Sequence, residues 1–92
     1  MRAIAVPIPR FLLRELDLLS NVGVEVVVVE EDGPASVSGV LAGDLIVAVN
    51  DHIVTSVDDV HRLTSDSGEE SLLTLTVVRD GHKRNIDVRI AL

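Results

Sequence analysis

The stretch from Asp32 to Asp51, which reads DGPASVSGVLAGDLIVAVND, constrains the fold of this chain more than any other. It begins with a polar turn. Pro34 suits the first position of a helix, because the amide hydrogen that proline lacks would have no partner there. Gly39 can take the left-handed conformation that commonly ends a helix. The first half of the stretch therefore predicts a turn followed by one short helix.

A buried strand is expected in the second half of the stretch. Gly43 and Asp44 bend the chain into residues 45–49, an unbroken apolar run of strand length. Such a run predicts a strand that is covered on both faces. Asn50 and Asp51 follow it, and both residue types tolerate the positive φ of a tight turn between paired strands.

This order of parts resembles the PDZ family, whose bacterial members often read G-S-P-A-x-x-A-G-L-x-x-G-D-x-I-x-x-V-N-G. Asp51 stands where glycine is usual, and Ser38 stands where a second alanine is usual. The residues that match the pattern are Gly33, Pro34, Ala35, Gly39, Val40, Gly43, Asp44, Ile46, Val49 and Asn50.

The length of 92 residues predicts a single domain, 1–92, with one modest core rather than two. Apolar residues make up 47% of the chain, but it contains one Phe and no Trp or Tyr. The core is therefore expected to be aliphatic and built mainly from Val, Leu and Ile.

Charge and segment length exclude several classes of function. The formal net charge is −7, with 8 Lys and Arg against 15 Asp and Glu, so nucleic acid and anionic membranes are repelled overall. No apolar run approaches the roughly 20 residues of a membrane span. The apolar residues after Arg2 are broken by Pro7 and Pro9, which does not fit a signal peptide. We expect either a cytosolic chain or a piece of a longer protein.

Three elements are expected before this stretch. Residues 3–8 read as a strand whose later part, with Pro7 and Pro9, belongs at a sheet edge or a strand end. Residues 10–19 read as a helix with Leu12, Leu16 and Leu19 on one face. Residues 22–30 are dominated by the valines at positions 24 and 26–29, and these five β-branched residues favour a strand.

The C-terminal part predicts a short strand, a helix and a hairpin. Residues 52–55 form the strand, and Ser56 caps the following helix with Asp59 in a capping-box position. Val60, Leu63 and Thr64 supply the inward face of this helix, which ends by Ser67-Gly68. Asp80-Gly81 is a strong two-residue turn signal between strands 72–79 and 83–92. In the second of these strands the inward-facing residues are expected to be Ile86, Val88, Ile90 and Leu92.

This element order is similar to that of the PDZ domains of HtrA/Deg-type, trypsin-like serine proteases, in which the first strand of animal PDZ domains is moved to the end. The segment IVTSVDDVHRL at residues 53–63 also resembles the P-V-x-S-x-x-D-L-x-x-x-L pattern of that subgroup. The resemblance implies a mainly β, α+β fold: a partly open antiparallel sandwich of five to six strands with two to three helices.

The resemblance also implies a site that binds C-terminal or extended peptides by β-strand addition. The groove would lie between the first strand and the helix that begins at Ser56. The loop that holds the peptide carboxylate would be residues 1–4, where Ala3 replaces the usual glycine. The candidate peptide-binding residues are Arg2, Ala3, Ile4, Ala5, Val6, Val57, His61 and Thr64.

Alternatives remain open for Arg2 and for the helical face that carries His61. Arg2 either attracts a carboxylate or is a solvated terminal residue, and the second is the commoner behaviour of terminal residues. Val57 and His61 are spaced i, i+4 and can share a helical face with Thr64. That face looks either at the groove or at water.

The sequence gives little indication of catalysis, metal binding or phosphate binding. Asp66-Ser67-Gly68 has the D-S-G of a trypsin-type nucleophile but lacks its flanking glycines, and nothing places a histidine beside Ser67. His52, His61 and His82 are far apart in sequence, so no metal site is expected. The glycines have turn or cap positions, and none forms a phosphate loop. No cofactor is expected.

We therefore expect a PDZ module with no catalytic activity of its own. The resemblance implies the substrate-binding or regulatory domain of an HtrA-like serine protease, with peptides and the protease domain of the same chain as partners. It also implies a periplasmic, secreted or membrane-anchored parent. The alternatives are a PDZ domain of a site-2-type metalloprotease or secretion component, and a structural interaction domain with a non-functional groove.

Overall fold

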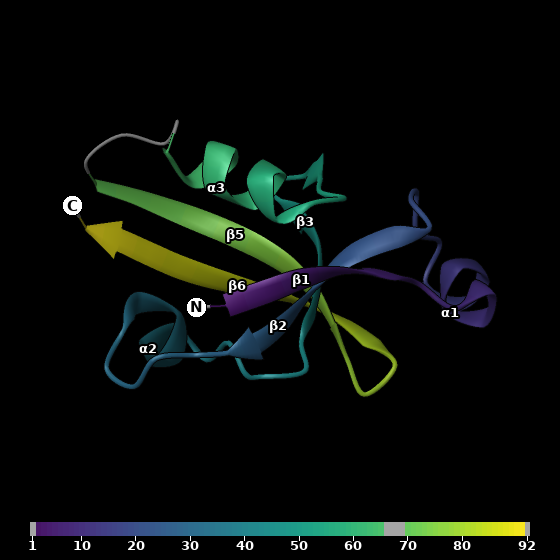
Figure 1. Ribbon diagram of the computed structural model, residues 1–92, viewed down its shortest axis with the longest axis horizontal. Helices are drawn as coiled ribbons and strands as arrows, with labels where there is room; N and C mark the ends of the chain where they lie inside the picture. The colour runs from purple at the N-terminus through teal and green to yellow at the C-terminus, as the bar shows by residue number, and fades with distance from the viewer. Residues whose placement is uncertain (1, 66–69, 92) are drawn as a thin grey trace.

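The computed structural model describes residues 2–65 and 70–91. Within this part, an antiparallel sheet carries three short helices (Figure 1). The strands are β1 (Arg2–Pro7), β2 (Val22–Val28), β3 (Leu45–Val49), β4 (His52–Ile53), β5 (Glu70–Arg79) and β6 (His82–Ala91). The helices are α1 (Arg10–Glu15), α2 (Pro34–Ser38) and α3 (Val57–Ser65).

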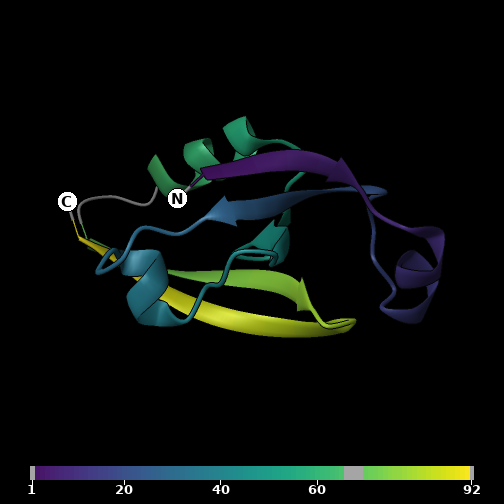
Figure 2. The ribbon, with the colours of Figure 1, turned by 60° about the horizontal axis from the view of Figure 1, so that its bottom comes forward.

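The sheet runs in the order β1-β2-β3-β5-β6, and β4 pairs with β3. Figure 2 shows the sheet curled into two layers, with the β1–β2 ribbon above the β5–β6 hairpin. Figure 2 shows α3 beside β1, with which it is in contact, and both ribbon views show α1 at one end of the molecule. This arrangement confirms the predicted fold class, a partly open sandwich of six strands and three helices, and the predicted order of elements.

Strand β3 lies between two layers of apolar side chains. Ile46 and Val49 are fully buried on one face, and Val47 is 7% exposed on the other. The pairing of β3 with β5 shifts register between Ile46 and Ala48, which lets Ile46 and Val49 face the same side. The prediction of a strand covered on both faces is confirmed. The main core consists of Val24, Val26, Val40, Ile46, Val49, Val54, Val60, Leu73, Leu75, Val77 and Val88.

A second, smaller apolar cluster lies on the other face of the sheet, under α1. Its buried members are Ile8, Val47 and Val78, and the partly buried residues packed against them are Leu12, Leu13, Leu16, Leu18 and Leu45. The sequence predicts a single core, so this cluster is an addition. It arises because the central strands are apolar on both faces.

Helix α1 is shorter than predicted. It ends at Glu15, and Asp17 then takes a left-handed conformation with φ of 54°. The helical face therefore does not continue to Leu19, which is 83% exposed. The expectation that Leu19 packs inward was wrong, and Leu13 and Leu18 contribute to the second cluster instead.

The predicted turns are confirmed by their backbone angles. Gly39, which follows α2, has a φ of 98°. Asn50 and Asp51 have φ values of 50° and 66°, as a two-residue turn between antiparallel strands requires. Asn50 also joins its turn to β5, because its side-chain oxygen accepts the Thr74 amide hydrogen at 2.9 Å and its own amide donates to the Thr74 carbonyl at 2.8 Å.

The C-terminal hairpin turns at Asp80-Gly81 as predicted, and Val88 of β6 is buried while its neighbours Asp87 and Arg89 are exposed. Ile86 packs against the main core. The side chain of Ile90 and residue Leu92 lie outside the part that the structure describes.

Candidate peptide-binding groove

Strand β1 forms one end of the sheet. It pairs with β2 on one side, and within residues 2–65 and 70–91 no strand pairs with its other side. Pro7 is its last residue, which confirms that the prolines lie at an edge and a strand end. An edge strand presents unpaired amide and carbonyl groups in a row. An extended segment of another chain can therefore pair with β1.

Helix α3 lies beside this strand and contacts it (Figure 2). Its start is capped as the sequence predicts: the Ser56 hydroxyl accepts the Asp59 amide hydrogen at 3.1 Å. The Asp59 carboxylate accepts hydrogen bonds from the amide and the hydroxyl of Thr55, at 3.1 and 3.3 Å. The reciprocal bond of this cap thus reaches Thr55, one residue earlier than in a standard capping box.

The packing of α3 fixes which of its side chains look outward. Val60 is 4% exposed in the main core, and Val57 and Leu63 pack against that core. His61 is exposed. The predicted inward positions of Val60 and Leu63 are confirmed, whereas the side chain of Thr64 is outside the described part.

The register of β1 divides the candidate residues between two faces. Ala3 pairs with Val26 and Ala5 pairs with Val24, and paired residues share a face. Val24 and Val26 belong to the main core, as does Val60 of α3, so Ala3 and Ala5 lie on the α3 side. Ala5 is nevertheless exposed, so α3 leaves open space above it.

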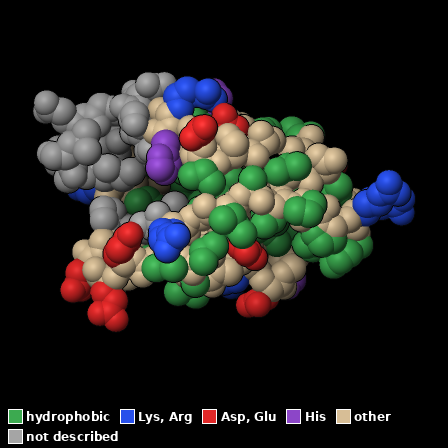
Figure 3. Space-filling view, in the orientation of Figure 1, with side chains coloured by type: hydrophobic (Ala, Val, Ile, Leu, Met, Phe, Trp, Pro, Cys, Tyr) green, Lys and Arg blue, Asp and Glu red, His purple; other side chains and the backbone are tan. Residues whose placement is uncertain are grey.

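Ile4 and Val6 lie on the opposite face of β1, paired with Glu25 and Gly23. Ile4 is 50% exposed there, and Val27 of β2, which lies two residues beyond Glu25, is 45% exposed. In the view of Figure 3 hydrophobic side chains gather over β1, β2 and α1. The structure thus places Ala3 and Ala5 on the side of the main core, against which Val57 of α3 also packs, and separates Ile4 and Val6 from them. The direction in which the exposed His61 faces stays a prediction.

Residues 2–4 were expected in a carboxylate-binding loop, but they belong to β1. Arg2 pairs with Val28, and the register shifts between Arg2 and Ala3. The pairing with β2 extends the strand through these residues, which corrects the expectation of a loop. The first residue of that expected loop, Met1, lies outside the described residues. Arg2 is exposed at the start of the strand.

The charges near α3 are acidic at its first turn. Asp58 and Asp59 lie there, and Arg62 donates to Asp59 at 2.8 Å. The hydrogen bond from the Thr55 amide, with those of the Thr55 and Ser56 hydroxyls and the charge of Arg62, lowers the pKa of Asp59 against the opposing effect of desolvation. The carboxylate therefore stays ionised and supports the helix start through the helix dipole.

His52, His61 and His82 lie on three different elements, β4, α3 and β6. Asp66, Ser67 and Gly68 lie outside the described residues. In the ranges 2–65 and 70–91, no group of three or more His, Asp or Glu side chains is placed to hold a metal ion. None of the helices in these ranges is long and apolar enough to cross a membrane.

Comparison with known proteins agrees with this geometry. The sequence model of the PDZ domain family matches residues 11–90. The chain therefore belongs to the PDZ domain family.

Its relatives are of the HtrA/Deg type. The chain is 33% identical over 85 residues to a probable periplasmic serine endoprotease DegP-like of Brucella suis, covering 92% of the chain and 17% of that protein. It is 32% identical over 69 residues to the protein of the same name from Halomonas elongata, covering 75% of the chain and 15% of that protein.

Solved structures show the same likeness. The HtrA-type protease AlgW with a decapeptide matches at a TM-score of 0.73 and 23% identity, over 98% of this chain and 28% of that one. A variant of AlgW, also with a decapeptide, matches at a TM-score of 0.71 and 26% identity. This match covers 76% of this chain and 21% of that one.

The chain thus spans less than a third of each of these proteins. It corresponds to their PDZ domain, and their catalytic domain is not part of it.

Proposed function

We propose that the chain binds C-terminal or extended peptides along β1, in the groove between this strand and α3. The single observation that carries the proposal is the unpaired edge of β1 beside α3, with Ala5 exposed on the α3 side. A peptide that adds to this edge gains backbone hydrogen bonds, and its alternate side chains point toward α3.

The groove side of β1 is lined by small residues, since Ala3 and Ala5 are the residues that face α3. Small side chains leave room for the side chains of the bound peptide. Val57 offers an apolar contact from α3, and His61 offers a polar one. The decapeptide-bound AlgW structures support a peptide as the ligand of a domain with this fold.

In its parent protein the domain would bind substrate or regulatory peptides beside the protease domain of the same chain. The names of its relatives, probable periplasmic serine endoproteases, support this role and a place outside the cytoplasm. Peptide capture would then position a substrate or shift the protease between resting and active states.

The test is a titration of the isotope-labelled 92-residue chain, followed by backbone amide shifts. The probes are two pools of decapeptides with randomised last four positions, one with a free C-terminal carboxylate and one amidated. Shifts that cluster on residues 3–6 and 57–63 support the proposal. Preference for the free carboxylate indicates terminal recognition, and equal binding indicates extended internal peptides. No shift with either pool overturns it and favours a structural interaction domain.

Two matched variants sharpen the test. Ala5→Phe fills the α3 side of β1 and is expected to weaken binding about tenfold or more, the equivalent of ~1.4 kcal/mol. Ile4→Phe adds the same ring to the opposite face of the same strand and is expected to leave binding unchanged. Equal effects of the two variants would contradict a groove on the α3 side.

A further inference from the structure

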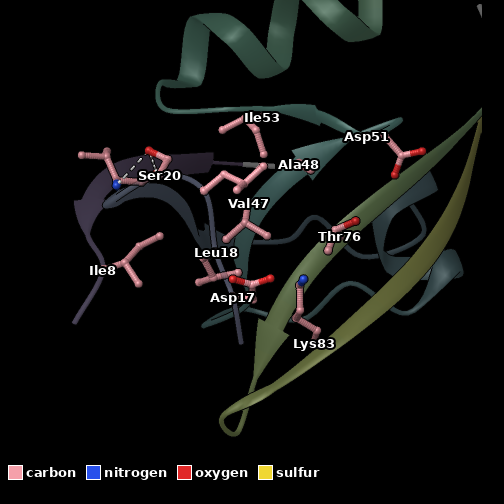
Figure 4. A pocket seen from close by; sticks show the side chains of 12 residues that line it. Ile8, Asp17, Leu18, Ser20, Val47, Ala48, Asp51, Ile53, Thr76 and Lys83 are labelled. Atoms are coloured by element: carbon pink, nitrogen blue, oxygen red, sulfur yellow. Dashed lines mark hydrogen bonds between the residues drawn. The ribbon is translucent and has the colours of Figure 1, made fainter. Parts of the chain in front are cut away.

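A second cavity lies away from the groove, between the connection from α1 to β2 and the outer side of β3 (Figure 4). Its volume is about 210 Å³. Its apolar lining is Ile8, Leu18, Leu19, Val22, Val47, Ala48 and Ile53. No residue of β1 or of α3 lines it.

Backbone hydrogen bonds fix the wall of this cavity. The Ile8 amide donates to the Asn21 carbonyl at 2.7 Å, and the Leu18 amide donates to the Leu13 carbonyl at 3.0 Å. These bonds hold the α1–β2 connection against the second apolar cluster. The cavity is therefore part of the folded structure rather than a gap between loose segments.

Two hydroxyl groups in the lining already have partners within the chain. The Ser20 hydroxyl donates to the Val22 carbonyl and accepts from the Val22 amide, both at 3.2 Å. The Thr76 hydroxyl donates to the Asn85 side-chain oxygen at 3.1 Å. Neither hydroxyl is well placed to define what the cavity binds.

Three charged side chains at the cavity have no such partner. Asp17, Asp51 and Lys83 line it, and among residues 2–65 and 70–91 none of them forms an ion pair or a side-chain hydrogen bond. Asp17 and Asp51 are in left-handed turns, with φ of 54° and 66°, and all three residues are exposed. Figure 4 shows the charged ends of Asp17 and Lys83 near Val47, and the carboxylate of Asp51 at the other end of the cavity.

The size and charge of the cavity limit its ligand. Its volume is below the ~300–1,000 Å³ of sites for drug-sized molecules and above the ~150 Å³ that holds benzene, so it suits one apolar side chain. An apolar anion would meet two carboxylates and one ammonium. A wholly apolar ligand would remove water from Asp17 and Lys83 without replacing it. A ligand with an apolar group, a cation and an adjacent carbonyl matches the apolar lining, Asp17 and Lys83.

From this geometry we infer that the cavity binds the N-terminal residue of a peptide whose first side chain is apolar. The side chain lies against Val47, Ala48 and Ile53. The α-ammonium donates to Asp17, and the first carbonyl accepts a hydrogen bond from Lys83. The net charge of −7 of the whole chain also favours a cationic group.

The test uses tripeptide amides, whose blocked C-terminus separates this site from terminal recognition at β1. The 92-residue chain is titrated to about 10 mM with Leu-Ala-Ala-amide, because so small a contact is expected to bind with a Kd near ~1 mM. Amide shifts are expected at residues 18, 47, 48 and 53. N-acetylation is expected to abolish these shifts, and Gly-Ala-Ala-amide, which has no first side chain, is expected to bind at least about fivefold more weakly.

Matched variants test the role of the charges. Asp17→Asn keeps a residue that tolerates positive φ and is expected to weaken binding about fivefold. Asp80→Asn, at another left-handed aspartate in the β5–β6 turn, is expected to have no effect. Equal binding of the N-acetylated peptide, shifts confined to β1 and α3, or no shift at any residue would each overturn the inference.

Discussion

Arg79 and Asp44 form a two-pronged ion pair that joins the start of β3 to the end of β5, 35 residues apart in sequence. Nε of Arg79 donates to one carboxylate oxygen at 2.7 Å, and Nη2 donates to the other. The same Nη2 also donates to the Gly39 carbonyl at 2.8 Å. Asp44 is 1% exposed and accepts the Leu41 amide hydrogen at 2.9 Å. The pair fixes the loop between α2 and β3 to the sheet.

Replacing Arg79 by Met is expected to lower Tm by about 10 °C or more, because a buried carboxylate is left without its cation. Unfolding should be followed by far-ultraviolet circular dichroism, since the chain has no Trp or Tyr. The control is Arg89→Met, at an exposed position of β6, which should change Tm by no more than about 3 °C. A similar Tm for both variants would show that the pair contributes little.

The same carboxylate predicts the acid sensitivity of the domain. Burial by itself raises the pKa of Asp44, but hydrogen bonds from Arg79 and Leu41 and the charge of Arg79 outweigh burial and lower it. Its stabilising effect is therefore complete above the unfolded-state pKa of about 3.9 and is lost as the pH falls through the lower folded-state pKa. Urea unfolding should show stability falling below about pH 4. The Arg79→Met variant should lose less stability over this range, and an equal loss would argue against Asp44 as the cause.

The cap of α3 gives a local prediction. Ser56→Ala removes the acceptor of the Asp59 amide hydrogen and is expected to cost about 1 kcal/mol of unfolding free energy. Ser36→Ala, at an exposed position inside α2, is expected to cost nothing measurable by urea denaturation. Peptide binding should also weaken in the Ser56 variant if α3 forms one wall of the groove.

Gly23 is required in β2 by close packing. A Cβ at this position would lie 2.9 Å from Leu45 Cδ1 and 3.3 Å from the Ile46 carbonyl oxygen. Gly23→Ala is therefore expected to cost about 1–3 kcal/mol in urea unfolding. Gly33→Ala has its nearest contact at 3.4 Å and should change stability by less than about 1 kcal/mol.

A double-mutant cycle identifies the cause of the Gly23 effect. Leu45 crowds this position with its Cδ1 and with its Cγ, which lies 3.2 Å from the added Cβ. Leu45→Val removes the Cδ1 atom, so Gly23→Ala should cost less unfolding free energy in this background than in the original chain. An unchanged cost would place the conflict at the Ile46 carbonyl instead.

The sequence by itself determined the elements and their order. Residues 45–49 predict a doubly buried strand because all five are apolar, and Asp80-Gly81 predicts a hairpin because such pairs accept positive φ. Ser56 and Asp59 predict the start of α3 through a local hydrogen bond. Each of these signals acts within a few residues, so each can be read without the rest of the fold.

The tertiary structure decided which side chains share a surface. The register of β1 against β2 places Ala3 and Ala5 toward α3 and sends Ile4 and Val6 to the other face. A shift by one residue would exchange these two sets, and nothing within β1 alone fixes that register. The partners of the candidate groove therefore depend on long-range strand pairing.

The Asp32–Asp51 stretch shows the same division. Its turns, helix and strand followed from local residue preferences, and the structure confirms them. The sequence did not indicate that Arg79 is the partner of the buried Asp44. Arg79 lies just before a turn signal, and no pattern around it marks it for burial. Likewise, Leu19 was expected inside because helical periodicity continues through it, but Asp17 in a left-handed conformation ended the helix first. Local propensity thus determined the scaffold, and packing between distant segments determined the ion pair, the residues that flank the candidate groove, and the cavity beside α1.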